Sequence, residues 1–69
     1  MASKFPIDIM FSVRMLASYM KISIEELARN SGISVDHLKN VSAKRTNMTA
    51  DDIVKLSAYT GIPVENIER

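Results

Sequence analysis

The chain has 69 residues, enough for one domain, and a domain this short buries only about 60% of its unfolded surface. It has no cysteine and one histidine, which excludes disulfides and thiolate metal sites. Nine Lys and Arg residues against eight Asp and Glu residues give a net charge of +1, so bulk charge gives little support for a nucleic-acid partner. No apolar run approaches the roughly 20 residues that cross a bilayer, and no signal pattern is visible near Met1, so we expect a cytoplasmic protein.

The first predicted helix covers about residues 6–20. Pro6 suits the first turn of a helix, and Asp8 complements the positive end of the helix dipole. Apolar residues then recur at i, i+4, i+7, i+8 and i+11, which places them on a single helical face. We expect this face to line the core, and it comprises Ile9, Val13, Leu16, Ala17 and Met20.

A short helix, a turn and a second short helix are predicted over about residues 23–42. Ser23 is followed three residues later by Glu26, which is the pattern of a capping box at a helix start. Gly32 is expected to end this helix with a positive φ, and Ser34 to start the next helix. Two helices joined by so sharp a turn form the geometry with which small domains place one helix in the DNA major groove.

The remaining residues predict one further long helix and a final helical turn. After a polar loop at residues 42–47, Thr49 with Asp52 starts a helix that Gly61 ends, and Pro63 opens the last turn. The residues expected to face the core here are Ile53, Leu56, Val64 and Ile67, with either Tyr59 or Thr60. The sequence therefore predicts a single all-α domain over residues 1–69, with no internal repeat.

Two separated motifs agree in register with one protein family. The first comprises Leu27, Ala28, the turn at residues 32–34, Leu38 and Val41, and the second spans residues 47–67. On these residues the chain resembles the phage Cro and repressor type of helix-turn-helix domain, also called the XRE family, from about Ile9 to its end. The resemblance implies a compact lambda-repressor-like fold of four to five helices. It also implies transcriptional regulation in a phage-type lysis/lysogeny switch, with DNA as a partner.

The resemblance places DNA contacts at the start of the second helix of the pair and in the loop after it. The residues at those positions are Ser34, Val35, Asp36, Lys39, Asn40, Lys44 and Arg45. Asn40 can bond an adenine edge and Val35 can pack on a thymine methyl, whereas Asp36 repels phosphates. Asp36 is better explained as a first-turn acid, and His37 is expected to face solvent. Ile24, where relatives often carry a polar residue, cannot bond phosphate. We therefore expect weak DNA binding, or binding together with a partner protein.

A second surface is predicted on the outward face of the 6–20 helix. Phe11, Met15 and Tyr19 line up opposite the expected core face, and a contiguous apolar patch usually marks an interface. The residues assigned to this interface are Ile7, Phe11, Met15 and Tyr19. Its expected partner is a phage repressor or a second copy of the chain, as in temperate-phage modulators of repression. Packing against residues 1–5 or the last turn is the alternative explanation of these side chains.

No catalytic constellation stands out. The adjacent pairs Glu25-Glu26 and Asp51-Asp52 each point about 100° apart on a helix, so neither pair converges on one site. We expect neither catalytic residues nor a metal, cofactor or membrane partner. Two functions remain: a DNA-binding regulator, or an antirepressor that acts by direct contact with the phage repressor.

Overall fold

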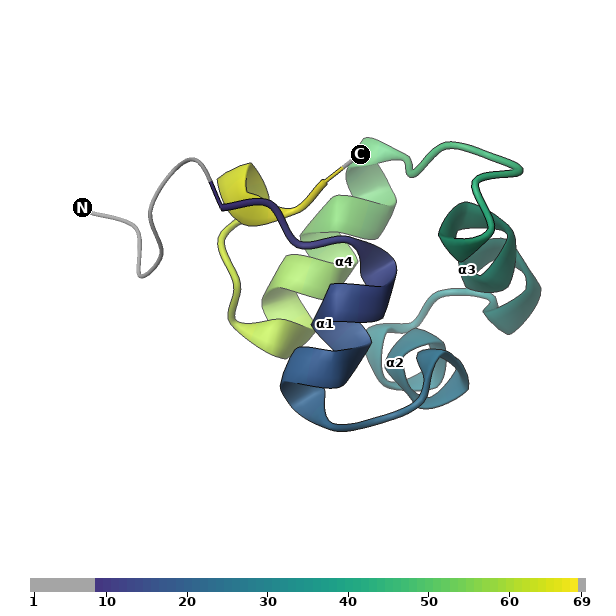
Figure 1. The fold of residues 1–69 in the computed structure, drawn as a ribbon, viewed down its shortest axis with the longest axis horizontal. Coiled ribbons are helices and arrows are strands. Elements are labelled where there is room, and N and C mark those ends of the chain that lie inside the picture. The colour runs from purple at the N-terminus through teal and green to yellow at the C-terminus, as the bar shows by residue number, and fades with distance from the viewer. Residues whose placement is uncertain (1–8, 69) are drawn as a thin grey trace.

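Every α-helix in the computed structural model, which describes residues 9–68, begins at a serine or threonine cap. The side chain of each cap accepts a hydrogen bond of 3.1 to 3.4 Å from the backbone N–H three residues later. The helices are α1 (Val13–Met20), α2 (Ile24–Ser31), α3 (Val35–Ser42) and α4 (Ala50–Thr60), followed by the short 3-10 helix η1 (Val64–Asn66) (Figure 1). The predicted all-α fold is confirmed.

Residues with positive φ end three of the four helices. Gly32 after α2 and Gly61 after α4 have φ values of 79° and 78°, as their positions in the sequence predict. Lys21 ends α1 with a φ of 58°, which the sequence does not signal because the residue carries a Cβ. The complete capping box forms at Thr49, where the Asp52 side chain accepts from the Thr49 N–H at 3.0 Å. At Ser23 the structure describes only the bond from the Glu26 N–H to the serine hydroxyl.

The predicted start of the first helix is wrong. The helix begins at Val13 with Ser12 as its cap, and residues 9–12 are not helical. Ile9, expected in the core, is 38% exposed as a result. The predictions for Pro6, Ile7 and Asp8 concern residues outside the described range.

The backbone of Phe11 pairs with the other end of the described chain. Its N–H donates to the Asn66 carbonyl at 2.7 Å, and its carbonyl accepts from the Glu68 N–H at 2.8 Å, forming an isolated parallel bridge with Ile67. The Asn66 side chain adds a bond of 2.9 Å from Nδ2 to the carbonyl of Ile9. These bonds use the peptide groups that a helix would need, which explains why α1 starts two residues later.

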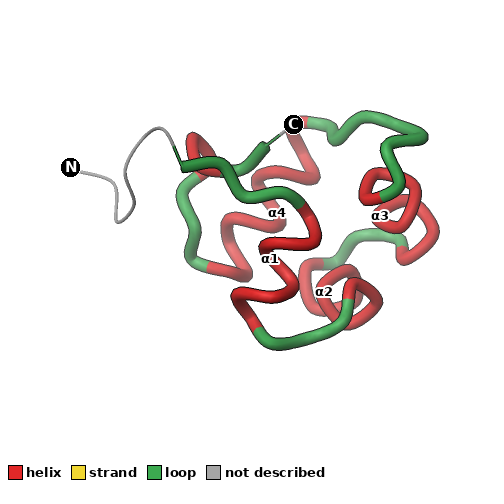
Figure 2. Tube along the Cα trace, viewed as in Figure 1, coloured by secondary structure: helices red, strands yellow, loops and turns green. Residues whose placement is uncertain are grey.

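The core lies where α2 meets its neighbours. α2 packs against α1, α3 and α4, so it is the central helix of the bundle, and α2 and α3 lie together at one end of the molecule (Figure 2). Val64, expected to cover the core, is 49% exposed, whereas Ile67 is buried. The buried apolar residues are Phe11, Val13, Leu16, Ala17, Leu27, Ala28, Ile33, Leu38, Met48, Ile53, Leu56, Ile62 and Ile67. Within residues 9–68, no helix has the length and apolar character needed to span a membrane.

Candidate nucleic-acid interface

α3 presents a short polar face to solvent. Leu38 is fully buried and anchors the helix, while Asp36 and Lys39 are exposed and Asn40 is half-buried on the outer side. Ser34 is exposed at the start of α3, where its hydroxyl accepts from the backbone N–H of His37 at 3.4 Å. The outward side of this helix thus carries one acid, one base and one amide. The base attracts the negatively charged DNA backbone, whereas the acid repels it.

Val35 differs from its predicted environment. It is half-buried and packs against the apolar core instead of standing out from the helix. A thymine methyl could therefore reach only part of its side chain. The contribution of Val35 to DNA contact remains a prediction, and the geometry favours its use in holding α3 on the bundle.

His37 does not face solvent as expected. Its Nε2 lies 2.6 Å from Oδ2 of Asp52, so the ring joins α3 to the first turn of α4. Only a third of the His37 side chain and a tenth of the Asp52 side chain are exposed. Burial raises the pKa of Asp52, but hydrogen bonds from the Thr49 backbone, from His37 and from the Thr49 side chain outweigh it. The pKa of this carboxyl therefore lies below its ordinary value.

The loop after α3 carries two unpaired cations. Lys44 adopts a left-handed conformation with a φ of 62°, and its N–H donates to the Val41 carbonyl at 3.0 Å. The Arg45 N–H donates to the Asn40 carbonyl at 2.9 Å, so the backbone of this loop is fixed to the end of α3. Both side chains are exposed, and neither forms an ion pair with another residue of the range 9–68.

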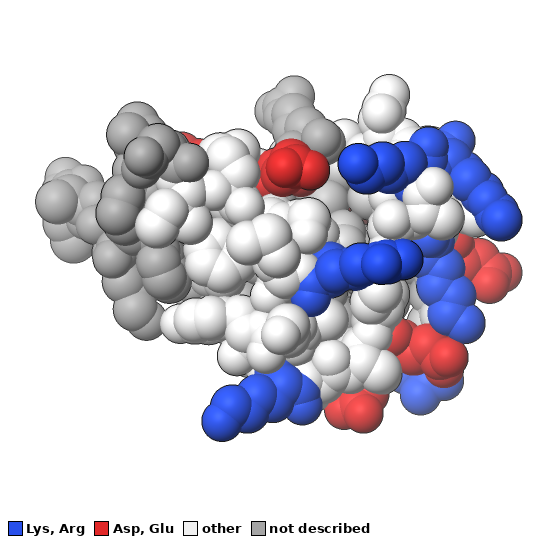
Figure 3. All heavy atoms as spheres, in the orientation of Figure 1, with Lys and Arg blue, Asp and Glu red and all other residues white. Residues whose placement is uncertain are grey.

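Arg14 adds a third cation to this surface. It projects from α1, and its Nε donates to Oγ of Ser42 at the end of α3, at 3.4 Å. Lys44 and Ser42 line one small hollow of about 80 Å³ between α1, α3 and the loop, together with Glu68. Figure 3 shows that Lys and Arg gather on the side of the molecule occupied by α3 and the loop after it. The place of Arg14 beside α3 depends on how α1 crosses α3, which the sequence alone does not show.

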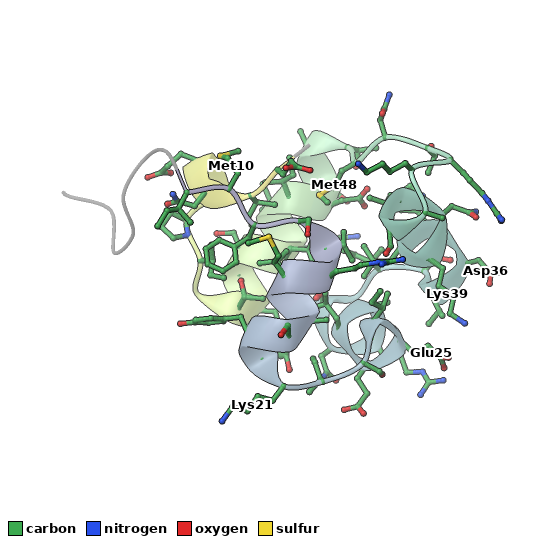
Figure 4. All side chains as sticks on the ribbon, viewed as in Figure 1. Met10, Lys21, Glu25, Asp36, Lys39 and Met48 are labelled. Atoms are coloured by element: carbon green, nitrogen blue, oxygen red, sulfur yellow. The ribbon has the colours of Figure 1, made fainter. Side chains whose placement is uncertain are left out.

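Lys39 is already engaged by an acid of α2. Its Nζ lies 3.2 Å from Oε1 of Glu25, and Oε2 of the same carboxylate lies 3.6 Å from Nη2 of Arg29. Figure 4 shows Glu25, Lys39 and Asp36 at the end of the molecule formed by α2 and α3. The predicted DNA-contact residues thus fall into a free group in the loop and a partly neutralised group on α3.

The predicted apolar stripe on the first helix is only partly present. Phe11 is 9% exposed and belongs to the core, because it precedes α1 and is held against residues 66–68. Its ring meets that of Tyr19 edge-on, with centroids 5.8 Å apart and an angle of 77° between planes. Met15 and Tyr19 are 47% and 42% exposed, as predicted, and Ile7 lies outside the described residues.

Further exposed apolar residues flank the terminal pairing. Met10 and Val64 line a shallow hollow with Ile53 and Ile67, and Met10 and Val64 are 40% and 49% exposed. Uncharged atoms cover much of the visible face on the side of the molecule away from α3 (Figure 3). Met15 and Tyr19 are therefore not alone in being apolar and exposed.

The adjacent carboxylates separate as predicted from helix geometry. Asp51 pairs with Lys55 on the next turn of α4 at 3.1 Å, whereas Asp52 turns toward His37. Among the described residues, no group of three or more His, Cys, Asp or Glu side chains could hold a metal ion.

No family model, curated protein or solved structure matches this chain.

Proposed function

We propose that the chain is a helix-turn-helix regulator of transcription in a phage-type switch, acting in the cytoplasm of a bacterial host. In this proposal α3 enters the major groove of DNA, and Lys44, Arg45 and Arg14 contact phosphates beside it. The supporting observation is the pair of capped short helices joined at Gly32, followed by a loop with two free cations. Phosphate contacts give affinity and register, while groove contacts give sequence preference.

The small number of free cations implies weak binding by the chain alone. Each phosphate neutralised contributes about −0.9 to the slope of log affinity against log salt. Three contacts, from Lys44, Arg45 and Arg14, predict a slope of about −2.7. Asp36 at the start of α3 repels phosphate and so weakens this attraction. A second protein bound beside the chain would supply additional contacts to the DNA.

Salt-dependent binding of a promoter fragment tests this proposal. The double variant Lys44→Gln with Arg45→Gln should make the slope less steep by up to about 1.8, from about −2.7 toward about −0.9, measured by fluorescence anisotropy between about 50 and 200 mM salt. Lys21→Gln, at the end of α1 far from the labelled α3 residues in Figure 4, is the single-charge control and should leave the slope nearly unchanged. Absence of binding to any promoter fragment at low salt would refute direct recognition of DNA.

A second candidate function is an antirepressor that contacts the phage repressor. Exposed Met15 and Tyr19 on α1 support it, because methionine and aromatic side chains are enriched where proteins meet. Met15→Asp should abolish association with a phage repressor, or with a second copy of this chain, in light scattering of the mixture and of the protein alone. Ser18→Asp, an exposed change on the same helix, is the control. Unchanged association of the Met15 variant would show that the surface formed by Met15 and Tyr19 is not the interface.

A further inference from the structure

The carboxylate of Glu25 bridges two cations of the helix-turn-helix unit. Oε1 lies 3.2 Å from Nζ of Lys39 on α3, and Oε2 lies 3.6 Å from Nη2 of Arg29 on α2. The helix-turn-helix unit and the loop after it, residues 23–46, hold four Lys and Arg residues, and this one acid engages two of them. Lys44 and Arg45 keep no such partner among the described residues.

We propose that Glu25 acts as a built-in competitor of DNA phosphate for Lys39, and thereby sets the affinity of the chain for duplex DNA. This inference rests on the proposed function, because it assumes that α3 approaches a duplex. A phosphate can use Lys39 fully only after the ammonium leaves the Glu25 carboxylate. The same carboxylate repels the incoming phosphate, so its removal favours binding in two ways.

The size of the effect follows from the exposure of the pair. The side chains of Glu25 and Lys39 are 47% and 53% exposed, so water and salt screen their attraction. An ion pair of this kind is worth at most about fivefold in an equilibrium constant. Docking can therefore break the bridge, but it does so at a measurable loss of affinity.

Glu26 provides an internal control for this proposal. It lies in the same first turn of α2, carries the same charge and is exposed, yet it forms no ion pair with any residue in the range 9–68. Removing either charge changes the net charge by the same amount, and both residues lie in the first turn, where the helix dipole favours an acid. A difference in DNA affinity between the two variants therefore measures the effect of the contacts of Glu25 with Lys39 and Arg29, and not the effect of the lost negative charge alone.

The experiment compares Glu25→Gln and Glu26→Gln in binding to a short duplex of mixed sequence, by anisotropy over a range of salt. Glu25→Gln should bind up to about fivefold more tightly than Glu26→Gln at low salt, and its salt slope should steepen by up to about 0.9, for one more phosphate contact. Adding Lys39→Gln to the Glu25 variant should return the salt slope to that of Lys39→Gln alone, because the additional phosphate contact is then lost. Only the gain in affinity from removing the repulsion between the Glu25 carboxylate and phosphate should remain.

The outcomes separate this inference from the function on which it rests. Equal affinities and slopes for the two glutamine variants, with the unchanged chain binding DNA, would overturn the competitor role and leave DNA binding intact. Binding seen only after Glu25→Gln would support the inference strongly. No binding by the unchanged chain or by either variant would refute both proposals. If the only role of Glu25 were to stabilise the packing of α2 on α3, Glu25→Gln would lower the melting temperature without tightening DNA binding. That result would also overturn the proposal.

Discussion

The contact between His37 and Asp52 should stabilise the fold and hold α3 in place. Its 2.6 Å separation and the low exposure of Asp52 indicate a charge-assisted hydrogen bond, worth about 1.5–3 kcal/mol when well shielded. Because His37 is a third exposed, we expect a coupling free energy of about 1 kcal/mol between the two side chains. Asp52→Ala should cost about 2 kcal/mol in total, since Thr49 also loses its capping bond.

The measurement is a double-mutant cycle of His37→Ala and Asp52→Ala, by urea unfolding followed with far-ultraviolet circular dichroism. For a domain of this size, about 1 kcal/mol corresponds to roughly 4–8 °C in melting temperature. The pKa of Asp52 is lowered on folding, so its contribution is present above the ordinary Asp pKa and is lost as the pH falls through the lower native pKa. The coupling should therefore persist at about pH 6 and decline only below about pH 4. Effects of the two substitutions that add within about 0.3 kcal/mol at pH 6 would refute the reasoning.

Three further substitutions test other features of the structure. Phe11→Ala should lower the free energy of unfolding by about 3 kcal/mol, because it empties a buried site; a loss below about 1 kcal/mol in urea unfolding would contradict a core position. Gly32→Ala should cost about 1 kcal/mol through the positive φ alone, since nothing lies within 4 Å of an added Cβ; an unchanged melting temperature would show that the turn relaxes. Asp36→Asn should tighten binding to a mixed-sequence duplex about twofold at low salt, because it removes a charge facing phosphates. Glu65→Gln on η1 is its matched control, and equal effects of the two changes would place α3 outside the groove.

Local signals in the sequence predicted most helix boundaries. Ser23, Ser34 and Thr49 each cap the helix that follows, and the two glycines each end a helix with positive φ. Such signals depend on bonds between residues three to five positions apart, so the sequence alone is sufficient to read them. Leu27, Ala28 and Leu38, which belong to the motif that carries the family resemblance, are buried in the core, whereas Val35 was expected at the DNA surface and packs against the core.

The errors arose where distant residues decide the structure. Pro6 and the periodicity from Ile9 predicted an early helix start, but Ser12 has no acidic partner three residues later to mark it as the cap. The bonds of Phe11 to Asn66 and Glu68 join opposite ends of the described chain and leave no periodic trace. Within the candidate site, the loop cations could be placed from sequence, whereas the Glu25 bridge and the His37 contact depend on how neighbouring helices pack.

The pairing of Phe11 with residues 66–68 means that this fold cannot be completed until those residues have been synthesised. The bond from Asn66 to Ile9 spans 57 positions, so a ribosome must release nearly the whole described chain before that contact can close. A product cut short before residue 66 would leave the peptide groups of Phe11 without those partners and its aromatic ring uncovered. We expect cellular proteases to degrade such fragments faster than chains that contain residues 66–68.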